Sequence, residues 1–152
     1  METDNTNWSQ SVTAVVIHNG KVLLSRHTYG AGKGRLIIPG GYLNRGEMPR
    51  EALIREYLEE TGVLIEPREL IGVRFNLRDW YAAFRADYVS GEPHSDHDEN
   101  SEVLWVDVSE ALTRGDVPDL TKKLIKCALS GGGFGKVDYT GVEPPYELFG
   151  AG

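Results

Sequence analysis

The chain of 152 residues is 40% hydrophobic and 26% charged, which suits one domain with a single core. Its formal charge of −7 disfavours a broad surface for a nucleic-acid polymer or an anionic membrane, because such surfaces need clustered Lys and Arg. The single cysteine, Cys127, excludes an intramolecular disulfide and a cysteine-based zinc site. With no apolar leader or bilayer-length apolar run, the sequence predicts a cytoplasmic protein.

The first predicted elements form a β-hairpin. Two apolar runs rich in β-branched residues, at 11–18 and 21–27, are joined by Asn19-Gly20, a pair that tolerates positive φ in a tight turn. A glycine-rich loop at 29–34 and a short apolar run follow, and this run ends at Pro39-Gly40-Gly41. Glycines at that point allow the backbone to approach a ligand closely.

A helix is predicted next, because the spacing of apolar residues becomes helical from Pro49 to Thr61. Pro49 suits the first turn of a helix, and Gly62 suits the left-handed position just past its end. Met48 offers no side-chain oxygen to cap the N-terminus, so the start of this helix is expected to be weakly capped.

The second half of the chain is predicted to hold three strands and a further helix. The strands are expected at 68–77, 80–89 and 103–108, with a polar, acidic loop at 90–102. A helix at 118–129 should pack on the sheet through Leu120, Leu124, Ile125 and Leu129. The glycine-rich tail shows no periodicity, so the predicted organisation is a polar segment at 1–10, a folded domain at 11–130 and a tail at 131–152.

The helix at 49–61 carries three glutamates on one stripe. With about 100° of rotation per residue, Glu59 and Glu60 lie within roughly 60° of Glu56, and like charges so placed are mildly destabilising. Arg55 can reach Glu59 at i,i+4, but the remaining charge suits a hard divalent cation such as Mg²⁺ or Mn²⁺. The alternative, a solvated acidic face with Lys or Arg partners, is the commoner explanation for such a cluster taken alone.

A wider pattern favours the cation. Eight residues fit G-x5-E-x7-R-E-U-x-E-E-x-G-U, where U is a bulky aliphatic residue: Gly41, Glu47, Arg55, Glu56, Glu59, Glu60, Gly62 and Val63. This segment resembles the signature of the Nudix hydrolase family, with Tyr57 where an aliphatic residue is usual. The resemblance implies an α/β fold, an α/β/α sandwich with a mixed β-sheet between helices, over about residues 11–130.

The resemblance also implies an activity and a metal site. Nudix enzymes are metal-dependent pyrophosphohydrolases that cleave a nucleoside diphosphate linked to another moiety, by attack of water on phosphorus. On this basis Glu56, Glu59 and Glu60 are expected to bind Mg²⁺ or Mn²⁺, with Glu56 or another carboxylate as the general base. A carbonyl of Gly40 or Gly41 is expected to complete the coordination.

Four further residues receive supporting roles from the resemblance. Arg55 is expected to orient Glu59, and Glu47 is expected to pair with Arg55 or with a metal-bound water. A further base or ligand is expected from the acidic loop before the last strand, where Glu99 and Glu102 are the candidates and Glu99 is preferred.

Several residues, some of them near the glycine-rich loop, are candidates for substrate contacts. Arg26 and Arg35 can contact phosphates or ribose, Tyr29 and Tyr81 can stack on a base, and Glu102 is placed with them. An aromatic residue at such a position is still more often part of a core than a stacking platform.

The sequence leaves three questions open. The substrate can be a nucleoside triphosphate, an ADP-sugar or a dinucleoside polyphosphate, because all three present the same pyrophosphate to the metal. The alternative to an enzyme is a non-catalytic nucleotide-binding or sensor module on the same scaffold. The expected partner is a small-molecule nucleotide, with no nucleic-acid polymer and no membrane, and a homodimer is neither predicted nor excluded.

Overall fold

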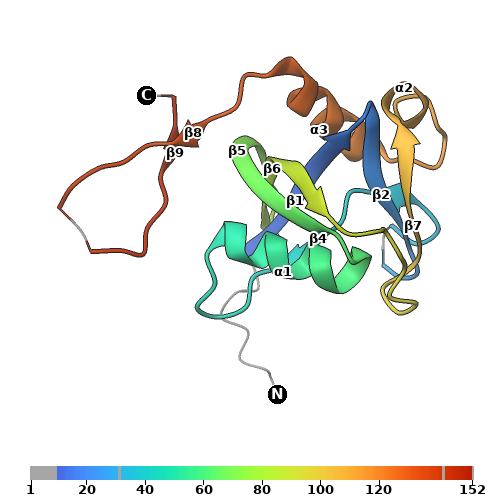
Figure 1. Ribbon diagram of the computed structural model, residues 1–152, viewed down its shortest axis with the longest axis horizontal. Coiled ribbons are helices and arrows are strands. Elements are labelled where there is room, and N and C mark those ends of the chain that lie inside the picture. Colours follow the sequence, from blue (N-terminus) through green and yellow to red (C-terminus); the bar gives the residue numbers. More distant parts are fainter. Residues whose placement is uncertain (1–9, 31, 142, 152) are drawn as a thin grey trace.

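The computed structural model describes residues 10–30, 32–141 and 143–151, so most of the predicted N-terminal segment lies outside the described residues (Figure 1). Within these ranges no helix has the length and apolar character that crossing a membrane requires. The elements, in chain order, are β1 (Gln10–His18), β2 (Lys21–His27), β3 (Leu36–Ile37), β4 (Gly40–Tyr42), α1 (Pro49–Thr61), β5 (Leu64–Phe75), β6 (Trp80–Ser90), β7 (Asn100–Asp107), α2 (Val108–Ala111), α3 (Asp119–Ser130), β8 (Gly135–Lys136) and β9 (Phe149–Gly150).

The sheet is mixed and β1 lies at its centre. β1 pairs in parallel with β6 on one side, and β6 pairs antiparallel with the edge strand β5. On its other side β1 has two antiparallel partners, β4 at Ser11–Thr13 and β2 at Ile17–His18. β2 carries β3 and β7. β1 therefore changes partner part-way along, and β4 brings the Gly-Gly segment to its N-terminal half.

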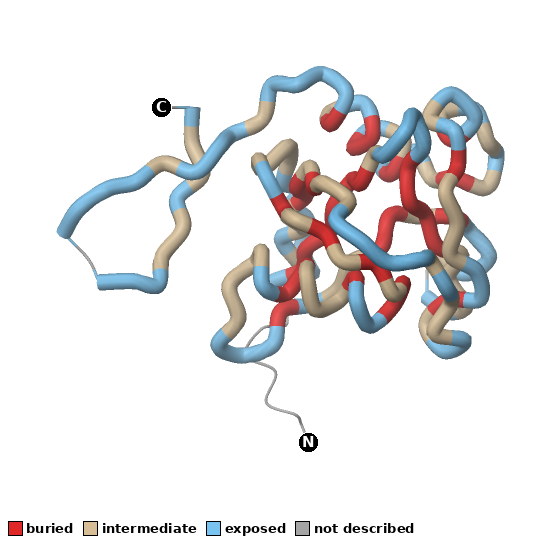
Figure 2. Tube along the Cα trace, in the orientation of Figure 1, coloured by how far each residue is buried: buried red, intermediate tan, exposed pale blue. Residues whose placement is uncertain are grey.

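Helices cover both faces of this sheet, as the side-chain alternation along β1 requires. Val12, Ala14 and Val16 pack in one core cluster with residues of α1. Val15 packs in a second cluster with residues of α3. Figure 2 shows the buried segments concentrated in the strands and on the inner sides of the helices. The predicted α/β/α sandwich with a mixed sheet is confirmed.

Local signals in the sequence placed two elements correctly. The hairpin turns at Asn19 and Gly20, with φ of 53° and 77°. α1 runs from Pro49 to Thr61 and ends at Gly62, whose φ of 75° is the left-handed value expected there. The start of α1 is better held than predicted, because the Met48 amide donates to Glu51 Oε1 at 2.8 Å.

Two strands begin earlier than predicted. β5 begins at Leu64 instead of residue 68 and includes Pro67, which an edge strand tolerates and which lies at an irregularity in its pairing with β6. β7 begins at Asn100 instead of residue 103. Its first residues are polar, so the apolar pattern of the sequence did not reveal them.

The predicted apolar stripe of α3 was partly wrong. Its buried residues are Thr121, Leu124, Ile125 and Ala128. Leu120 and Leu129 are exposed. Positions 121, 124, 125 and 128 follow the i, i+3, i+4, i+7 spacing of a single face, and small residues at its ends allow close packing on the sheet.

The glycine-rich tail is irregular over much of its length but touches the domain at defined points. Phe134 and Leu70 exchange backbone hydrogen bonds of 2.8 and 2.9 Å at the edge of β5. The Phe149 ring packs against Phe84 with centroids 5.3 Å apart. In Figure 1 the rest of the tail loops away from the sheet, joined through β8 and β9.

Candidate active site

α1 is fixed to the sheet by its apolar face. Ala52, Leu53 and Tyr57 are buried, and the Tyr57 hydroxyl donates to the Ala14 carbonyl of β1 at 2.6 Å. Tyr57, where the signature has an aliphatic residue, therefore fills the core and also binds a carbonyl of β1. The packing of Ala52, Leu53 and Tyr57 in the core sets the rotation of α1 and so the direction in which its glutamates point.

The three glutamates of the predicted stripe have different surroundings. Glu60 is buried, and the side chain of Glu56 is only 13% exposed. The Glu59 side chain is 60% exposed. Oxygens of Glu56, Glu60 and Glu99 lie within 4.8 Å of one another, whereas Glu59 is outside this group. We call Glu56, Glu60 and Glu99 the carboxylate cluster.

The carboxylate cluster concentrates negative charge in a partly dry place. Burial, reinforced by Glu56 and Glu99, raises the pKa of Glu60 to about 10. Burial and the charge of Glu56 also raise the pKa of Glu99. A solvated acidic face does not explain a buried glutamate beside two others. The donor set, carboxylate oxygens alone, is the set that Mg²⁺ and Mn²⁺ prefer, so the residues present fit the expected cation.

Arg55 organises the carboxylates around the cluster. Its guanidinium donates two hydrogen bonds to Glu47, at 2.6 and 2.9 Å, and one each to Glu56 at 3.0 Å and Glu59 at 3.2 Å. Its Nη2 also reaches the Tyr42 carbonyl at 3.2 Å. The pairing with Arg55 lowers the pKa of Glu47 and raises that of Arg55. The contacts predicted for Arg55 with Glu47 and Glu59 are therefore both present.

Gly40 and Gly41 are needed for two different close approaches. A Cβ on Gly40 would lie 2.2 Å from the Val12 carbonyl oxygen of β1, and one on Gly41 would lie 2.6 Å from the Glu56 carboxylate. A side chain at position 40 would meet the backbone of β1, whereas a side chain at position 41 would displace the Glu56 carboxylate. Both glycines line the hollow that holds the carboxylate cluster.

The hollow over the cluster has a volume of about 230 Å³ and a neighbour of about 240 Å³. The first is lined by His27, Tyr29, Gly40, Gly41, Tyr42, Asn44, Glu56, Glu60 and Glu99. The second shares the first five of these residues and adds Ser11, Ile37, Ile38, Asp79 and Tyr81. The candidates Tyr29 and Tyr81 thus lie at the site, together with Tyr42, Asn44 and Asp79, which the sequence did not predict. The sequence marks these residues only by their places in the chain: Tyr42 and Asn44 follow Gly41, and Asp79 precedes β6.

Three predicted substrate residues lie outside both hollows. Arg26 pairs with Glu102 at 3.0 Å and with Asp116 at 3.2 Å, and it also donates to the Gly34 carbonyl. Arg35 is exposed. The pairing of Arg26 with Glu102 explains the placement of both residues without a substrate.

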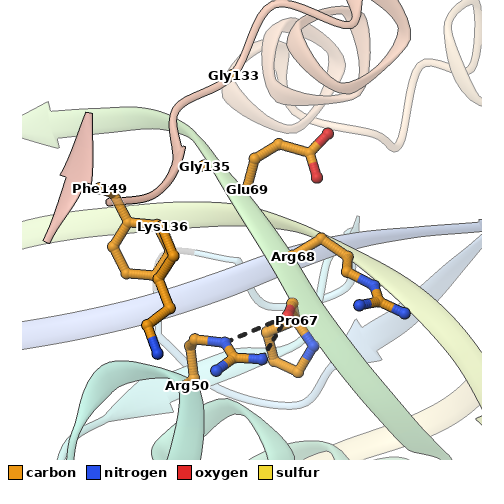
Figure 3. A pocket seen from close by; sticks show the side chains of 8 residues that line it. All are labelled: Arg50, Pro67, Arg68, Glu69, Gly133, Gly135, Lys136 and Phe149. Carbon is orange, nitrogen blue, oxygen red and sulfur yellow. Dashed lines mark hydrogen bonds between the residues drawn. The ribbon is translucent and has the colours of Figure 1, made fainter. Parts of the chain in front are cut away.

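A larger hollow, of about 480 Å³, lies elsewhere and shares no lining residue with the carboxylate cluster (Figure 3). Its cationic side chains are largely neutralised. Arg50 donates to the Pro67 carbonyl at 2.9 Å, as drawn in Figure 3, and pairs with Glu66 and Glu147. Arg68 pairs with Asp87 at 2.7 Å. The volume of a hollow therefore does not by itself identify the active site of this protein.

Comparison with known proteins identifies the family. A family model described as "NUDIX domain" matches residues 8–126. The chain belongs to the Nudix family. This Nudix chain is 35% identical over 111 residues to the uncharacterized Nudix hydrolase YvcI of Bacillus subtilis, covering 66% of this chain and 68% of that protein. A solved structure of a NUDIX hydrolase from Nitrosomonas europaea shares the fold, with a TM-score of 0.73 at 24% identity, covering 84% of this chain and 92% of that one.

A second relative carries a more specific name. The Nudix chain is 35% identical over 63 residues to the ADP-ribose pyrophosphatase of Methanocaldococcus jannaschii. This match covers 41% of this chain and 37% of that protein. The chain therefore spans little more than a third of the length of that relative.

Proposed function

We propose that this Nudix protein is a metal-dependent pyrophosphohydrolase that cleaves a nucleoside diphosphate linked to another moiety, by attack of water on phosphorus. The observation that carries the proposal is the convergence of Glu56, Glu60 and Glu99 within 4.8 Å, in a hollow bounded by Gly40 and Gly41. An acidic hollow repels a diphosphate, so a site of this charge accepts such a substrate only through a cation.

In this proposal Glu56 and Glu60 hold Mg²⁺ or Mn²⁺ with Glu99. When bound, the cation neutralises charge on the phosphoryl oxygens and activates water. Arg55 keeps Glu56 in place through its 3.0 Å hydrogen bond and is itself fixed by Glu47. A role for Glu59 as a ligand, and for the carbonyls of Gly40 and Gly41, stays a prediction.

Glu99 is the stronger candidate for the general base. It comes from a loop and not from the helix that supplies Glu56 and Glu60, so one of its carboxylate oxygens can accept a proton while the other contributes to the cation site. Glu56 is held by Arg55, which suits a fixed ligand more than a group that gains and loses protons.

The aromatic hollow beside the cluster suits the nucleoside. Tyr29 lines both hollows and Tyr81 lines the second, so a base stacked there leaves its diphosphate over the carboxylates. The name of the archaeal relative, ADP-ribose pyrophosphatase, supports including ADP-ribose among the substrates to be tested. Nucleoside triphosphates and dinucleoside polyphosphates present the same diphosphate and belong in the same panel. A small nucleotide in the cytoplasm remains the predicted partner.

The test measures turnover of these three substrate classes with Mg²⁺ or Mn²⁺, detected as release of a nucleoside monophosphate. Glu60→Gln should abolish turnover. Glu92→Gln is the matched control, because Glu92 is exposed and lies outside the carboxylate cluster. Full activity of Glu60→Gln would refute the proposal. If the wild type binds nucleotides and gains thermal stability but forms no product, the alternative of a non-catalytic sensor module is correct.

A further inference from the structure

The residue after Glu99 makes an unusual contact with α1. Asn100 is 1% exposed, and its side-chain amide Nδ2 donates to the Glu60 carbonyl at 3.0 Å. The Asn100 side chain thus links the residue next to Glu99 to the backbone of Glu60. The signature of the family does not include this position, and nothing in the sequence distinguishes Asn100 from its polar neighbours.

A bulge in β7 turns Asn100 inward. Arg26 of β2 pairs with Glu102, but the next residue, His27, pairs with Asn100, so Ser101 has no partner of its own. In a regular ladder Ser101 would stand opposite His27, and Asn100 would face the other side. The bulge exposes Ser101 and buries Asn100 on the side of the hollow that His27 lines.

The acidic loop and the start of β7 also bond to the C-terminal carbonyls of α1. The last carbonyls of a helix lack helical partners. In α1 the Glu60 carbonyl accepts from Asn100 and the Thr61 carbonyl accepts from the His94 amide at 2.9 Å. Gly62 is tightly packed here, since a Cβ on it would lie 2.3 Å from His94 Nε2. The segment from the loop into β7 is therefore attached to the end of α1 at two points, His94 and Asn100, and Glu99 lies beside the second.

The contact also leaves one polar atom unsatisfied. Asn100 Oδ1 is buried and has no hydrogen-bond partner in the part of the chain that the structure describes. A buried acceptor without a partner is destabilising, and an apolar side chain of the same size avoids that cost. The contribution of Asn100 that an apolar residue cannot replace is therefore the hydrogen bond from its Nδ2 to the Glu60 carbonyl.

We propose that Asn100 is a positioning residue that holds Glu99 against Glu60 and so completes the carboxylate cluster as a cation site. This rests on the proposed function. Glu99 repels Glu56 before a cation arrives. Its loop is otherwise bonded mainly to itself and to the residue that follows β2: Asp96 Oδ1 accepts from the Glu99 amide at 3.0 Å, and the Glu99 carbonyl accepts from the Thr28 amide at 3.2 Å. The Asn100 amide counters that repulsion by tying the loop to α1.

The first experiment measures Mn²⁺ affinity by electron paramagnetic resonance, without substrate, for the wild type and Asn100→Leu. Leu matches the size of Asn but cannot donate. We expect the dissociation constant to rise at least about tenfold, the range typical of lost outer-sphere support. An affinity within twofold of the wild type overturns the proposal. Asn100→Ala is the second variant, in case Leu disturbs folding.

Ser95→Ala is the matched control. The Ser95 hydroxyl donates to the Asn100 carbonyl at 2.8 Å and accepts from the His97 amide, so its loss also weakens the loop but leaves the bond to Glu60. We expect Ser95→Ala to keep its Mn²⁺ affinity within about threefold. An equal loss in Ser95→Ala and Asn100→Leu means that general loop stability, and not positioning by Asn100, sets the affinity.

A double-mutant cycle tests whether Asn100 acts through Glu99. In the Glu99→Gln background, Asn100→Leu should weaken Mn²⁺ binding by less than twofold, because the carboxylate that it positions is already gone. An undiminished tenfold effect in that background overturns the assigned route.

A measurement without metal separates this inference from the proposed function. Amide hydrogen exchange should be faster at His94 in metal-free Asn100→Leu than in the wild type, since the loop leaves α1. Unchanged exchange at His94 overturns the positioning role even if the wild type is an active enzyme. If exchange at His94 is faster in Asn100→Leu than in the wild type, but the wild type neither binds Mn²⁺ nor turns over nucleotides, the tie is supported and the proposed function is refuted instead.

Discussion

Replacing Glu60 with Gln should stabilise the metal-free protein at neutral pH while removing its metal binding. Glu60 is 5% exposed, and burial beside Glu56 and Glu99 raises its pKa from 4.5 to about 10. In the unfolded chain the same group ionises near its ordinary pKa. The folded protein therefore binds one more proton than the unfolded chain at every pH between those two values.

The sign and size of the effect follow from proton linkage. A pKa raised by folding contributes stability that is complete below pH 4.5 and is lost as the pH rises toward 10. Each pH unit in that window costs about 1.4 kcal/mol, so between pH 5.5 and 7.5 the metal-free wild type should lose about 3 kcal/mol through this group. Gln has no proton to lose and avoids that cost.

The assay is urea unfolding of both proteins in excess chelator at pH 5.5 and 7.5. The stability of Glu60→Gln relative to the wild type should rise by about 3 kcal/mol between the two pH values. Glu92→Gln should show no such rise. Adding Mn²⁺ should stabilise the wild type and leave Glu60→Gln almost unchanged, because only the folded wild type binds the ion. The same stability difference at both pH values would refute the assignment of a buried, proton-binding Glu60.

Three further substitutions test the surroundings of the cluster. Gly41→Ala should weaken Mn²⁺ binding at least about tenfold, because the new Cβ meets the Glu56 carboxylate, whereas Gly115→Ala adds a Cβ in open space and should leave the affinity unchanged. Tyr57→Phe should lower the free energy of unfolding by about 1 kcal/mol in urea and leave kcat unaltered, since the lost hydrogen bond joins two core elements. Arg55→Lys keeps the charge but loses the paired contacts of the guanidinium, so kcat should fall at least about tenfold; full turnover would contradict that role.

Features that depend on neighbouring residues were available from the sequence. The bounds of α1 follow from its helical period, from Pro49 at its start and from Gly62 at its end, and the structure keeps all three. The hairpin at Asn19-Gly20 and the fit of the Nudix signature are equally local. The contact of Arg55 with Glu59 could also be predicted, because residues four apart on a helix are neighbours whatever the helix packs against.

The composition of the carboxylate cluster was decided by tertiary structure. Helical periodicity placed Glu56, Glu59 and Glu60 on one stripe, but it cannot tell which part of a stripe faces the protein. Packing of Tyr57 on β1 turns Glu60 inward and leaves Glu59 exposed, and the loop before β7 brings in Glu99 from about forty residues away in the chain. Sequence supplied the ligand chemistry. Contacts between distant elements, including the bulge that buries Asn100, selected which carboxylates meet, because that choice depends on the rotation of a helix and the register of a strand, and neither is encoded within a single segment.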